Sequence, residues 1–229
     1  MKRPEAAKRQ PGRRSAAESR DTRERLLAAA EKHFARYGYS GTSIRDLGSA
    51  LGIASSSVLY HVGSKRKLYA LVLQRISDSL SSVLHHIEDG SGADMMQQFA
   101  ERLMSWSELH PYYVQILVHE MMENPDRLGE VHRWLLAGFM QDALGLSARA
   151  TARQNGNKVD ADMVLMLILG AVINFHISLP TFMALRGTVD RLELKRRFMD
   201  TLDQFLGMAL SSPRKNIKSG STIRIRARP

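Results

Sequence analysis

The chain has 229 residues, 44% of them hydrophobic, which is enough for one large or two small domains with an apolar core. It has no cysteine, which excludes a disulfide framework, a cysteine nucleophile and thiolate metal sites, and suits a reducing cytoplasm. No apolar run precedes Leu26, so we expect no signal peptide.

The formal net charge of +10 is distributed unevenly along the chain. Residues 1–20 carry seven Lys or Arg against two acids, and residues 212–229 carry six and no acid. Residues 21–73 carry eight against four, whereas residues 74–211 carry twelve against seventeen. A basic segment joined to an acidic body favours nucleic-acid binding. The charge, Pro and Gly at both ends predict disordered basic tails. We expect the N-terminal tail to reach the DNA minor groove or backbone. A solubilising role is the alternative for each tail.

The first helix is expected from about Asp21 to Tyr37, with an apolar stripe along one face. A shorter helix should begin at Ser43, because Asp46 three residues later completes a capping box with Asp in place of Glu or Gln. Gly52 supplies the left-handed residue that ends this helix and turns the chain. The residues expected on the inner faces of the two helices are Leu26, Leu27, Ala30, Phe34 and Tyr37, and Ile44, Leu47 and Leu51.

A third helix, expected from Ala54 to His61, has an unusual outer surface. Val58 and Val62 point inward, which leaves Tyr60 and three serines outside. Serine is an indifferent helix former and adds no packing. Short hydroxyl side chains would instead let a helix enter the major groove and bond to bases or phosphates. A solvated polar face is the alternative interpretation.

The neighbouring helix ends also favour phosphate. Thr42 and Ser43 lie at a helix N-terminus, where backbone N–H groups and the helix dipole attract anions. Lys65 lies in the first turn of the next helix, where a cation is poorly placed unless an anion binds beside it. Arg45, in the first turn of its own helix, is placed to reach a base or a phosphate.

The order of these parts follows a recognisable pattern. It comprises Tyr37-Gly38-Tyr39, Thr42, Arg45-Asp46-Leu47, Leu51-Gly52-Ile53, Leu59-Tyr60-His61-Val62, and Ser64-Lys65 with Leu68. With this pattern, residues 21–73 resemble the DNA-binding domain of the TetR family of transcriptional repressors. The resemblance implies a three-helix helix-turn-helix domain and places Tyr60 and His61 at phosphate-contact positions. The expected DNA contacts are therefore Thr42, Ser43, Arg45, Ser55, Ser56, Ser57, Tyr60, His61 and Lys65.

Two residues depart from the family pattern. Ala54 stands where the family has an N-capping Ser, a change that costs about 1 kcal/mol of helix stability. Ser55 is the expected replacement cap, which would shift the helix start by one residue. Leu59 replaces a Tyr whose hydroxyl commonly touches phosphate in the family. Both departures shift the expected contacts toward the remaining polar residues.

The rest of the chain is also predicted to be helical, since no β-alternation is long enough for a strand, and the fold class is therefore all-α. A helix from Lys65 to about Ile87 is the expected rigid link from the DNA-binding domain to the body. The further helices are expected at about 94–109, 112–123, 126–154, 160–186 and 190–210, separated by Gly, Asn and Pro.

Residues 163–185 are apolar nearly all round and long enough to span a bilayer. Asn174, His176 and Pro180 argue against a span. A soluble helix that is apolar on all sides must be buried on all sides, which a partner subunit would achieve. We therefore expect a homodimer through helices about 160–186 and 190–210, in agreement with the family's use of its last two long helices. Two DNA-binding domains imply a roughly palindromic operator.

The resemblance further implies a C-terminal helical domain that binds a small-molecule effector and dimerises. Candidate pocket residues are polar or aromatic side chains among apolar helices, although each is more often simple core. They are Trp106, Tyr112, His119, Met122, Trp134, Phe139, Phe175 and His176.

The stretch His119-Glu120-Met121-Met122-Glu123 begins like the zinc-protease motif HExxH but lacks the second His. A solvated or salt-bridged helix is the preferred interpretation of this stretch. The alternative, which only this stretch supports, is a metal- or small-molecule-binding enzyme with Glu123 in place of the second His. No Gly-rich phosphate loop, nucleophile elbow or paired-carboxylate signature is present. We therefore expect no enzyme, metal or cofactor.

The sequence thus predicts a cytoplasmic, homodimeric, sequence-specific repressor that an effector releases from its operator. The alternative is a structural DNA-binding protein that uses its tails and has no effector. The expected organisation is a basic arm (1–20), a helix-turn-helix domain (21–73), an effector-binding and dimerisation domain (74–211) and a basic tail (212–229).

Overall fold

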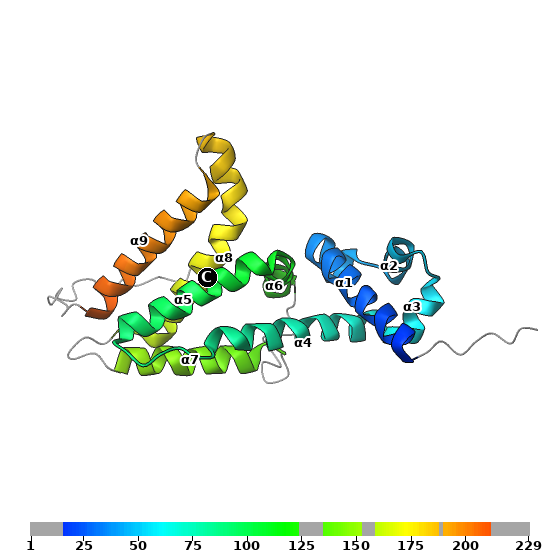
Figure 1. Cartoon of the computed structure of the whole chain (residues 1–229), viewed down its shortest axis with the longest axis horizontal. Coiled ribbons are helices and arrows are strands. Elements are labelled where there is room, and N and C mark those ends of the chain that lie inside the picture. The colour runs from blue at the N-terminus through cyan, green and yellow to red at the C-terminus, as the bar shows by residue number, and fades with distance from the viewer. Residues whose placement is uncertain (1–15, 124–134, 153–158, 188–189, 212–229) are drawn as a thin grey trace, which may run out of the picture. The chain divides into compact units, whose positions relative to one another are not determined.

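The computed structural model describes residues 16–123, 135–152, 159–187 and 190–211. These residues form nine α-helices and no β-strand (Figure 1), which confirms the all-α class. The helices are α1 Ala16–Gly41, α2 Ile44–Leu51, α3 Ser55–Val62, α4 Lys65–Leu84, α5 Gly92–Leu109, α6 Pro111–Glu123, α7 Ala137–Ala152, α8 Ala161–Arg186 and α9 Arg191–Ser211.

The ends of three helices differ from the sequence-based expectation. α1 begins at Ala16, so residues 16–20, which we expected in a disordered arm, are helical. α4 ends at Leu84 instead of Ile87, because His86 adopts a positive φ of 59°, and the His86 carbonyl accepts a hydrogen bond of 2.9 Å from Arg102. The helix expected over 126–154 begins only at Ala137 in the described residues, after a turn at 135–136.

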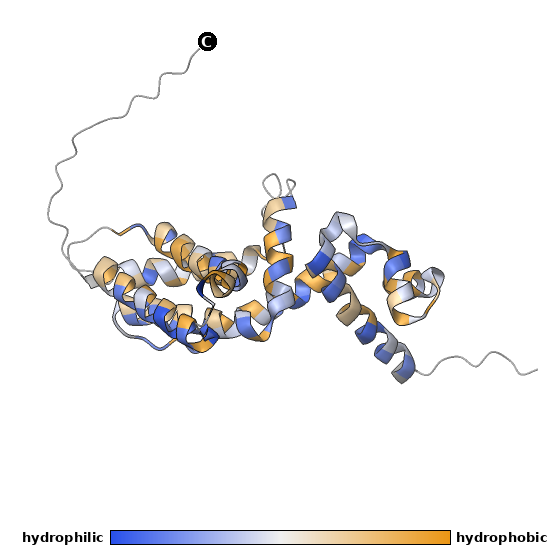
Figure 2. Ribbon diagram, turned by 90° about the horizontal axis from the view of Figure 1, so that it is seen from above, coloured by the Kyte–Doolittle hydropathy of each residue, from blue (hydrophilic) through white to orange (hydrophobic). Residues whose placement is uncertain are grey.

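The chain divides into two compact units, Met1–Ser82 with Trp106–Met140, and Val83–Ser105 with Gln141–Pro229. In the first unit α6 packs on α1, while α2 and α3 pack on each other and on α1. Hydrophobic and hydrophilic residues alternate along the helices of this unit (Figure 2). The expected domain boundary at residue 73 stays a prediction. Buried apolar side chains of this unit include Leu26, Leu27, Ala30, Phe34, Leu47, Val58, Val62, Leu68 and Val72.

One residue of the predicted inner face of α1 is placed differently. Tyr37 is 47% exposed, although Leu26, Leu27, Ala30 and Phe34 are buried as expected. The reason is Gly38, whose φ of 67° and ψ of −179° interrupt the helix directly after Tyr37. The chain turns there, and Tyr39 lies against Phe34 instead, with 6.3 Å between ring centroids.

The second unit is built from parts of α5 and α7 together with α8 and α9. Ala150 of α7 approaches α5 so closely that a Cβ on Gly92 would lie 2.1 Å from its carbonyl oxygen, so this position requires glycine. The Ser147 hydroxyl donates to the Ala161 carbonyl at 2.7 Å and thereby connects α7 to the start of α8. Between α8 and α9, the rings of Phe175 and Phe198 are 4.7 Å apart.

Much of the apolar surface of α8 and α9 remains exposed. Among the described residues α8 alone has the length and hydropathy of a membrane span, and 28% of its apolar window is buried. The single chain therefore does not bury this helix on all sides. The large exposed apolar side chains are Met163, Met166, Leu167, Ile177, Phe182, Met183 and Leu185 of α8, and Leu192, Phe205 and Met208 of α9.

Candidate nucleic-acid interface

The start of α2 is closed by the predicted capping box. The Asp46 amide donates to the Ser43 hydroxyl oxygen at 3.1 Å, and the Ser43 amide donates to the Asp46 carboxylate at 3.1 Å. The Ser43 hydroxyl also donates to this carboxylate at 2.6 Å. These hydrogen bonds, the one from the Ser43 side chain above all, lower the pKa of Asp46 below its ordinary value. Ser43 itself is exposed, at the helix end predicted to face phosphate.

The turn between α2 and α3 uses two glycines for different reasons. Gly52 adopts the left-handed conformation with φ 67° and ψ 30°, which confirms its predicted role as the end of α2. The Ile53 amide donates to the Gly48 carbonyl at 2.9 Å. A Cβ on Gly48 would lie 2.7 Å from the Ile53 carbonyl oxygen, so only glycine admits this close approach. The two residues together fix where α3 begins.

α3 presents the predicted polar surface. Val58 and Val62 are buried as expected, whereas Tyr60 is 85% exposed and Ser56 and Leu59 are also exposed. The Tyr60 ring lies edge-on to that of His61, with 5.3 Å between centroids. Ser55, Ser57 and His61 are half-buried.

The expectation that Ser55 caps α3 is wrong. Ala54 is the N-cap residue, with φ −66° and ψ 147°, and makes no side-chain capping bond. Ser55 is instead the first residue of the helix. The Gly48–Ile53 hydrogen bond fixes the preceding turn and therefore leaves the helix start at the position the family pattern gives it.

Two residues predicted to contact DNA differ in accessibility. Arg45 is exposed in the first turn of α2. Thr42 is only 2% exposed, and its hydroxyl donates to the Gly38 carbonyl at 2.9 Å. The Thr42 side chain thus connects the end of α1 to the start of α2, and its amide also donates to the Tyr39 carbonyl, at 3.4 Å.

At the start of α4, the Lys67 amide donates to the Ser64 hydroxyl at 3.1 Å. The Lys65 ammonium lies 4.3 Å from the centroid of the Tyr39 ring, which is a cation–π contact. Tyr39 belongs to the predicted motif but was not among the expected site residues. No local signal pairs these residues, because they are 26 positions apart and meet only through the packing of α1 with α4.

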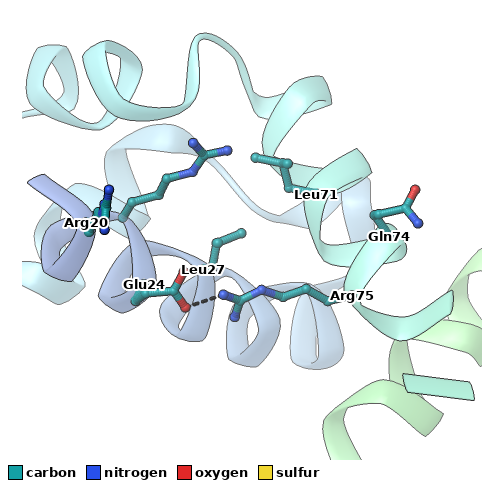
Figure 3. A pocket seen from close by; sticks show the side chains of 7 residues that line it. Arg20, Glu24, Leu27, Leu71, Gln74 and Arg75 are labelled. Atoms are coloured by element: carbon teal, nitrogen blue, oxygen red, sulfur yellow. Dashed lines mark hydrogen bonds and ion pairs between the residues drawn. The ribbon is translucent and has the colours of Figure 1, made fainter. Parts of the chain in front are cut away.

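A cleft of about 470 Å³ separates the N-terminal half of α1 from the middle of α4 (Figure 3). Leu27 and Leu71 lie among three arginines there. Arg75 forms ion pairs with Glu24 and, at 3.4 Å, with Glu31, which outweigh the effect of its burial and raise its pKa. Exposed Arg20 and Arg23 make no ion pair with another described residue, so they add positive charge to the cleft. The residues that line the cleft are Arg20, Arg23, Glu24, Leu27, Leu71, Gln74 and Arg75.

The effector candidates occupy varied environments. Trp106 is buried and donates from Nε1 to the Ser79 hydroxyl at 2.8 Å, and Phe139 is buried as well. Tyr112 and Met122 are both exposed, Met122 by 82%. In the second unit the rings of neighbouring Phe175 and His176 are 5.7 Å apart. None of these residues lines the cleft, and Trp134 lies outside the described residues.

His119, the remaining candidate, belongs to the stretch that begins like a zinc motif. Its Nδ1 lies 2.6 Å from Oε1 of Glu123, one helical turn later. This contact within one helix agrees with the solvated or salt-bridged helix that we preferred for this stretch. Across the described ranges, no group of three or more His, Cys, Asp or Glu side chains is arranged to hold a metal ion.

Comparison with known proteins agrees with this geometry. Residues 26–72 match the family model described as "Bacterial regulatory proteins, tetR family". The chain is 25% identical over 166 residues to "Probable acrEF/envCD operon repressor" of Escherichia coli (strain K12), covering 69% of this chain and 76% of that protein. It is 21% identical over 198 residues to "HTH-type transcriptional regulator TtgR" of Pseudomonas putida, covering 78% and 91%.

Solved structures share the fold. The ketosteroid transcriptional regulator KstR2 of Mycobacterium tuberculosis gives a TM-score of 0.61 at 18% identity, covering 83% of this chain and 96% of that one. The TetR family transcriptional regulator PfmR from Thermus thermophilus gives 0.56 at 19% identity, covering 85% and 98%. The motif, the geometry of the helix-turn-helix and these similarities agree, and residues 26–72 are a DNA-binding domain of the TetR family of bacterial transcriptional regulators.

Proposed function

We propose that this regulator binds a specific DNA sequence through α3 and represses transcription as a homodimer. The observation that carries the proposal is α3 itself. Tyr60 and Ser56 are exposed there, while Val58 and Val62 anchor the opposite face in the core. A helix with that surface can enter a major groove and read base edges.

The flanking helix ends support binding to the DNA backbone. The N-terminus of α2 is exposed at Ser43, and that of α4 has Lys65 in its first turn. Helix N-termini and lysines both favour phosphate oxygens, and such contacts set the register of a protein on its site. The excess of four basic residues in 21–73 contributes the same way.

The exposed apolar side chains of α8 and α9 support the homodimer. A soluble chain rarely leaves this many large apolar side chains on two successive helices exposed to water. A second copy would cover them through a two-fold interface, with α8 and α9 of each copy packed together. The dimer then carries two copies of α3, which matches an operator with two half-sites.

Release by a small-molecule effector completes the proposal. An effector bound within residues 74–211 would favour one orientation of α4 over another and so change the separation of the two α3 helices. Similarity to the family supports this step, and the candidates for the pocket remain the residues named from the sequence. On this proposal the protein acts in the cytoplasm and is not an enzyme. The lack of cysteine fits that location.

The test is a binding titration. A duplex is selected from a random-sequence pool with the full chain, and its affinity is compared with that of a scrambled duplex at several salt concentrations. We expect tighter binding to the selected duplex by about 1,000-fold or more, with affinity that falls as salt rises. Equal, weak binding to both duplexes would overturn the proposal that the protein is a sequence-specific repressor.

Deleting residues 1–15 and 212–229 separates the repressor from the alternative, a structural DNA binder that uses its tails. A repressor without these segments keeps its preference for the selected duplex, although its affinity decreases. A binder that relies on its tails loses binding to both duplexes.

A further inference from the structure

A series of side-chain contacts connects Lys65 to a buried carboxylate of α6. The Lys65 ammonium lies 4.3 Å from the centroid of the Tyr39 ring, and the Tyr39 ring lies 4.9 Å from that of Tyr69. The Tyr69 hydroxyl donates to Oε2 of Glu120 at 2.7 Å. All four residues belong to the first compact unit.

The Tyr69 ring is held at both of its ends. One edge contacts Phe34, which is fully buried, with 4.9 Å between ring centroids. The hydroxyl is held by Glu120, which is only 2% exposed. Burial, and then the hydrogen bond and charge of Glu120, raise the pKa of Tyr69 far above its ordinary value, so the hydroxyl stays protonated and remains a donor.

This fixed ring determines where Tyr39 can lie, and Tyr39 lies beneath Lys65. A lysine side chain has many rotamers in water and loses that freedom when it binds a phosphate. An ammonium attracted to the face of an aromatic ring has lost part of that freedom before DNA arrives. The conformational entropy that the lysine side chain loses on binding DNA is therefore smaller, and the affinity for DNA is correspondingly higher.

We propose that Tyr39, Tyr69 and Glu120 are positioning residues for DNA binding. They hold the Lys65 ammonium at the start of α4, where a backbone phosphate reaches it. The inference rests on the proposed function, because it takes Lys65 as a phosphate contact. It adds to that function three residues of the first unit that need not touch DNA.

The first experiment uses two substitutions of Tyr39 and the duplex selected with the wild-type chain. Tyr39→Phe keeps the ring, so the dissociation constant should stay within about twofold of wild type. Tyr39→Leu removes the ring and should weaken binding about three- to fivefold. Tyr37→Leu is the matched control, because that ring is exposed and does not contact Lys65, and it should bind like wild type.

The second experiment separates positioning from mere stability of the fold. In a Lys65→Met background there is no ammonium to position, so Tyr39→Leu should change the affinity less than about 1.5-fold. Tyr69→Phe removes only the hydroxyl that Glu120 holds. It should weaken binding in the wild-type background and have no further effect beside Lys65→Met. If circular dichroism shows that Tyr39→Leu does not fold, the comparison of Tyr69→Phe with and without Lys65→Met tests the positioning role by itself.

The failure of this inference is distinguishable from the failure of the proposed function. If Lys65→Met changes neither the affinity for the selected duplex nor its salt dependence, Lys65 is not a phosphate contact. The positioning role of Tyr39, Tyr69 and Glu120 is then wrong as well. If Lys65→Met makes the negative slope of log affinity against log salt shallower by about 0.9 for each Lys65, or about 1.8 for the proposed dimer, the contact is real. Equal losses from Tyr39→Leu and Tyr69→Phe with and without Lys65 would then overturn the positioning role alone.

Discussion

The Ser43 hydroxyl lies 2.6 Å from the Asp46 carboxylate, and each residue also accepts a hydrogen bond of 3.1 Å from the other's amide. This reciprocal pair satisfies two backbone donors at the start of α2 that would otherwise have no partner within the helix. Because α2 carries the turn into α3, the pair also fixes the position of the exposed surface of α3.

Replacing Asp46 by Asn should make the protein less stable in a manner that depends on pH. The carboxylate has a folded-state pKa below its ordinary value of 3.8, so the unfolded chain binds the proton more readily. The stabilisation by Asp46 is therefore complete above about pH 4 and is lost as the pH falls through the lowered pKa. Thermal unfolding of wild type and Asp46→Asn at several pH values between about 3 and 7 measures this.

The Ser91–Asp94 pair at the start of α5 repeats this arrangement, with hydrogen bonds of 2.7, 3.0 and 3.2 Å. The pKa of Asp94 is lowered as well, so Asp94→Asn should show the same pH dependence. Asp142→Asn, at an exposed position of α7, is the control. A difference between Asp46→Asn and wild type that is the same at both ends of this pH range would contradict the explanation.

Replacing Gly48 by Ala should destabilise the first unit. The new Cβ would lie 2.7 Å from the Ile53 carbonyl oxygen, and the neighbour is backbone that cannot rotate away. A loss of about 1–3 kcal/mol in the free energy of unfolding is expected, as for overpacking in a core. Urea unfolding measures it. Gly138→Ala in α7 is the matched control, because its Cβ would meet no atom within 4 Å and Ala favours helix. Equal stability of the two variants would show that the turn adjusts freely.

Replacing Tyr60 by Ala should weaken binding to the selected duplex more than to a scrambled one. The side chain is 85% exposed on α3, so its removal leaves the core intact. A lost base contact costs about 1–3 kcal/mol, roughly a 5- to 150-fold change, whereas a lost phosphate contact would weaken binding to both duplexes alike. Fluorescence anisotropy with both duplexes is the measurement. Ser56→Ala should act in the same direction, and Ser105→Ala on α5 should have no effect. If Tyr60→Ala binds the selected duplex as tightly as wild type, the proposal that α3 contacts the bases through Tyr60 is wrong.

Replacing Met166 by Glu should dissociate the proposed homodimer. Met166 is exposed on the most apolar helix of the chain, and a dimer interface would bury the new carboxylate without a partner. Sedimentation equilibrium should show a monomer for Met166→Glu and a dimer for wild type. The matched control is Met122→Glu on α6, a methionine that is even more exposed. If both variants remain dimeric, α8 does not form the interface.

The amino-acid sequence by itself determined the local features of this protein. Ser43 with Asp46 predicted the start of α2, and Gly52 predicted its end, and both are confirmed. Val58 and Val62 were correctly assigned to the buried face of α3. Capping, left-handed turns and helical periodicity depend on residues within a few positions of one another. A single sequence contains that information directly, and the same motif carried the resemblance to the family.

The tertiary structure decided which side chains are free and what they contact. Thr42 is buried and bonded, Tyr37 is exposed, and Tyr39 lies beneath Lys65. Tyr69 and Glu120, 51 positions apart, meet only because α6 packs on α1 within the first unit. Such pairings depend on how whole helices are oriented by their packing. No periodicity along the chain encodes that orientation, so the exposed surface of α3 could be predicted, whereas the contacts of Tyr39, Tyr69 and Glu120 could not.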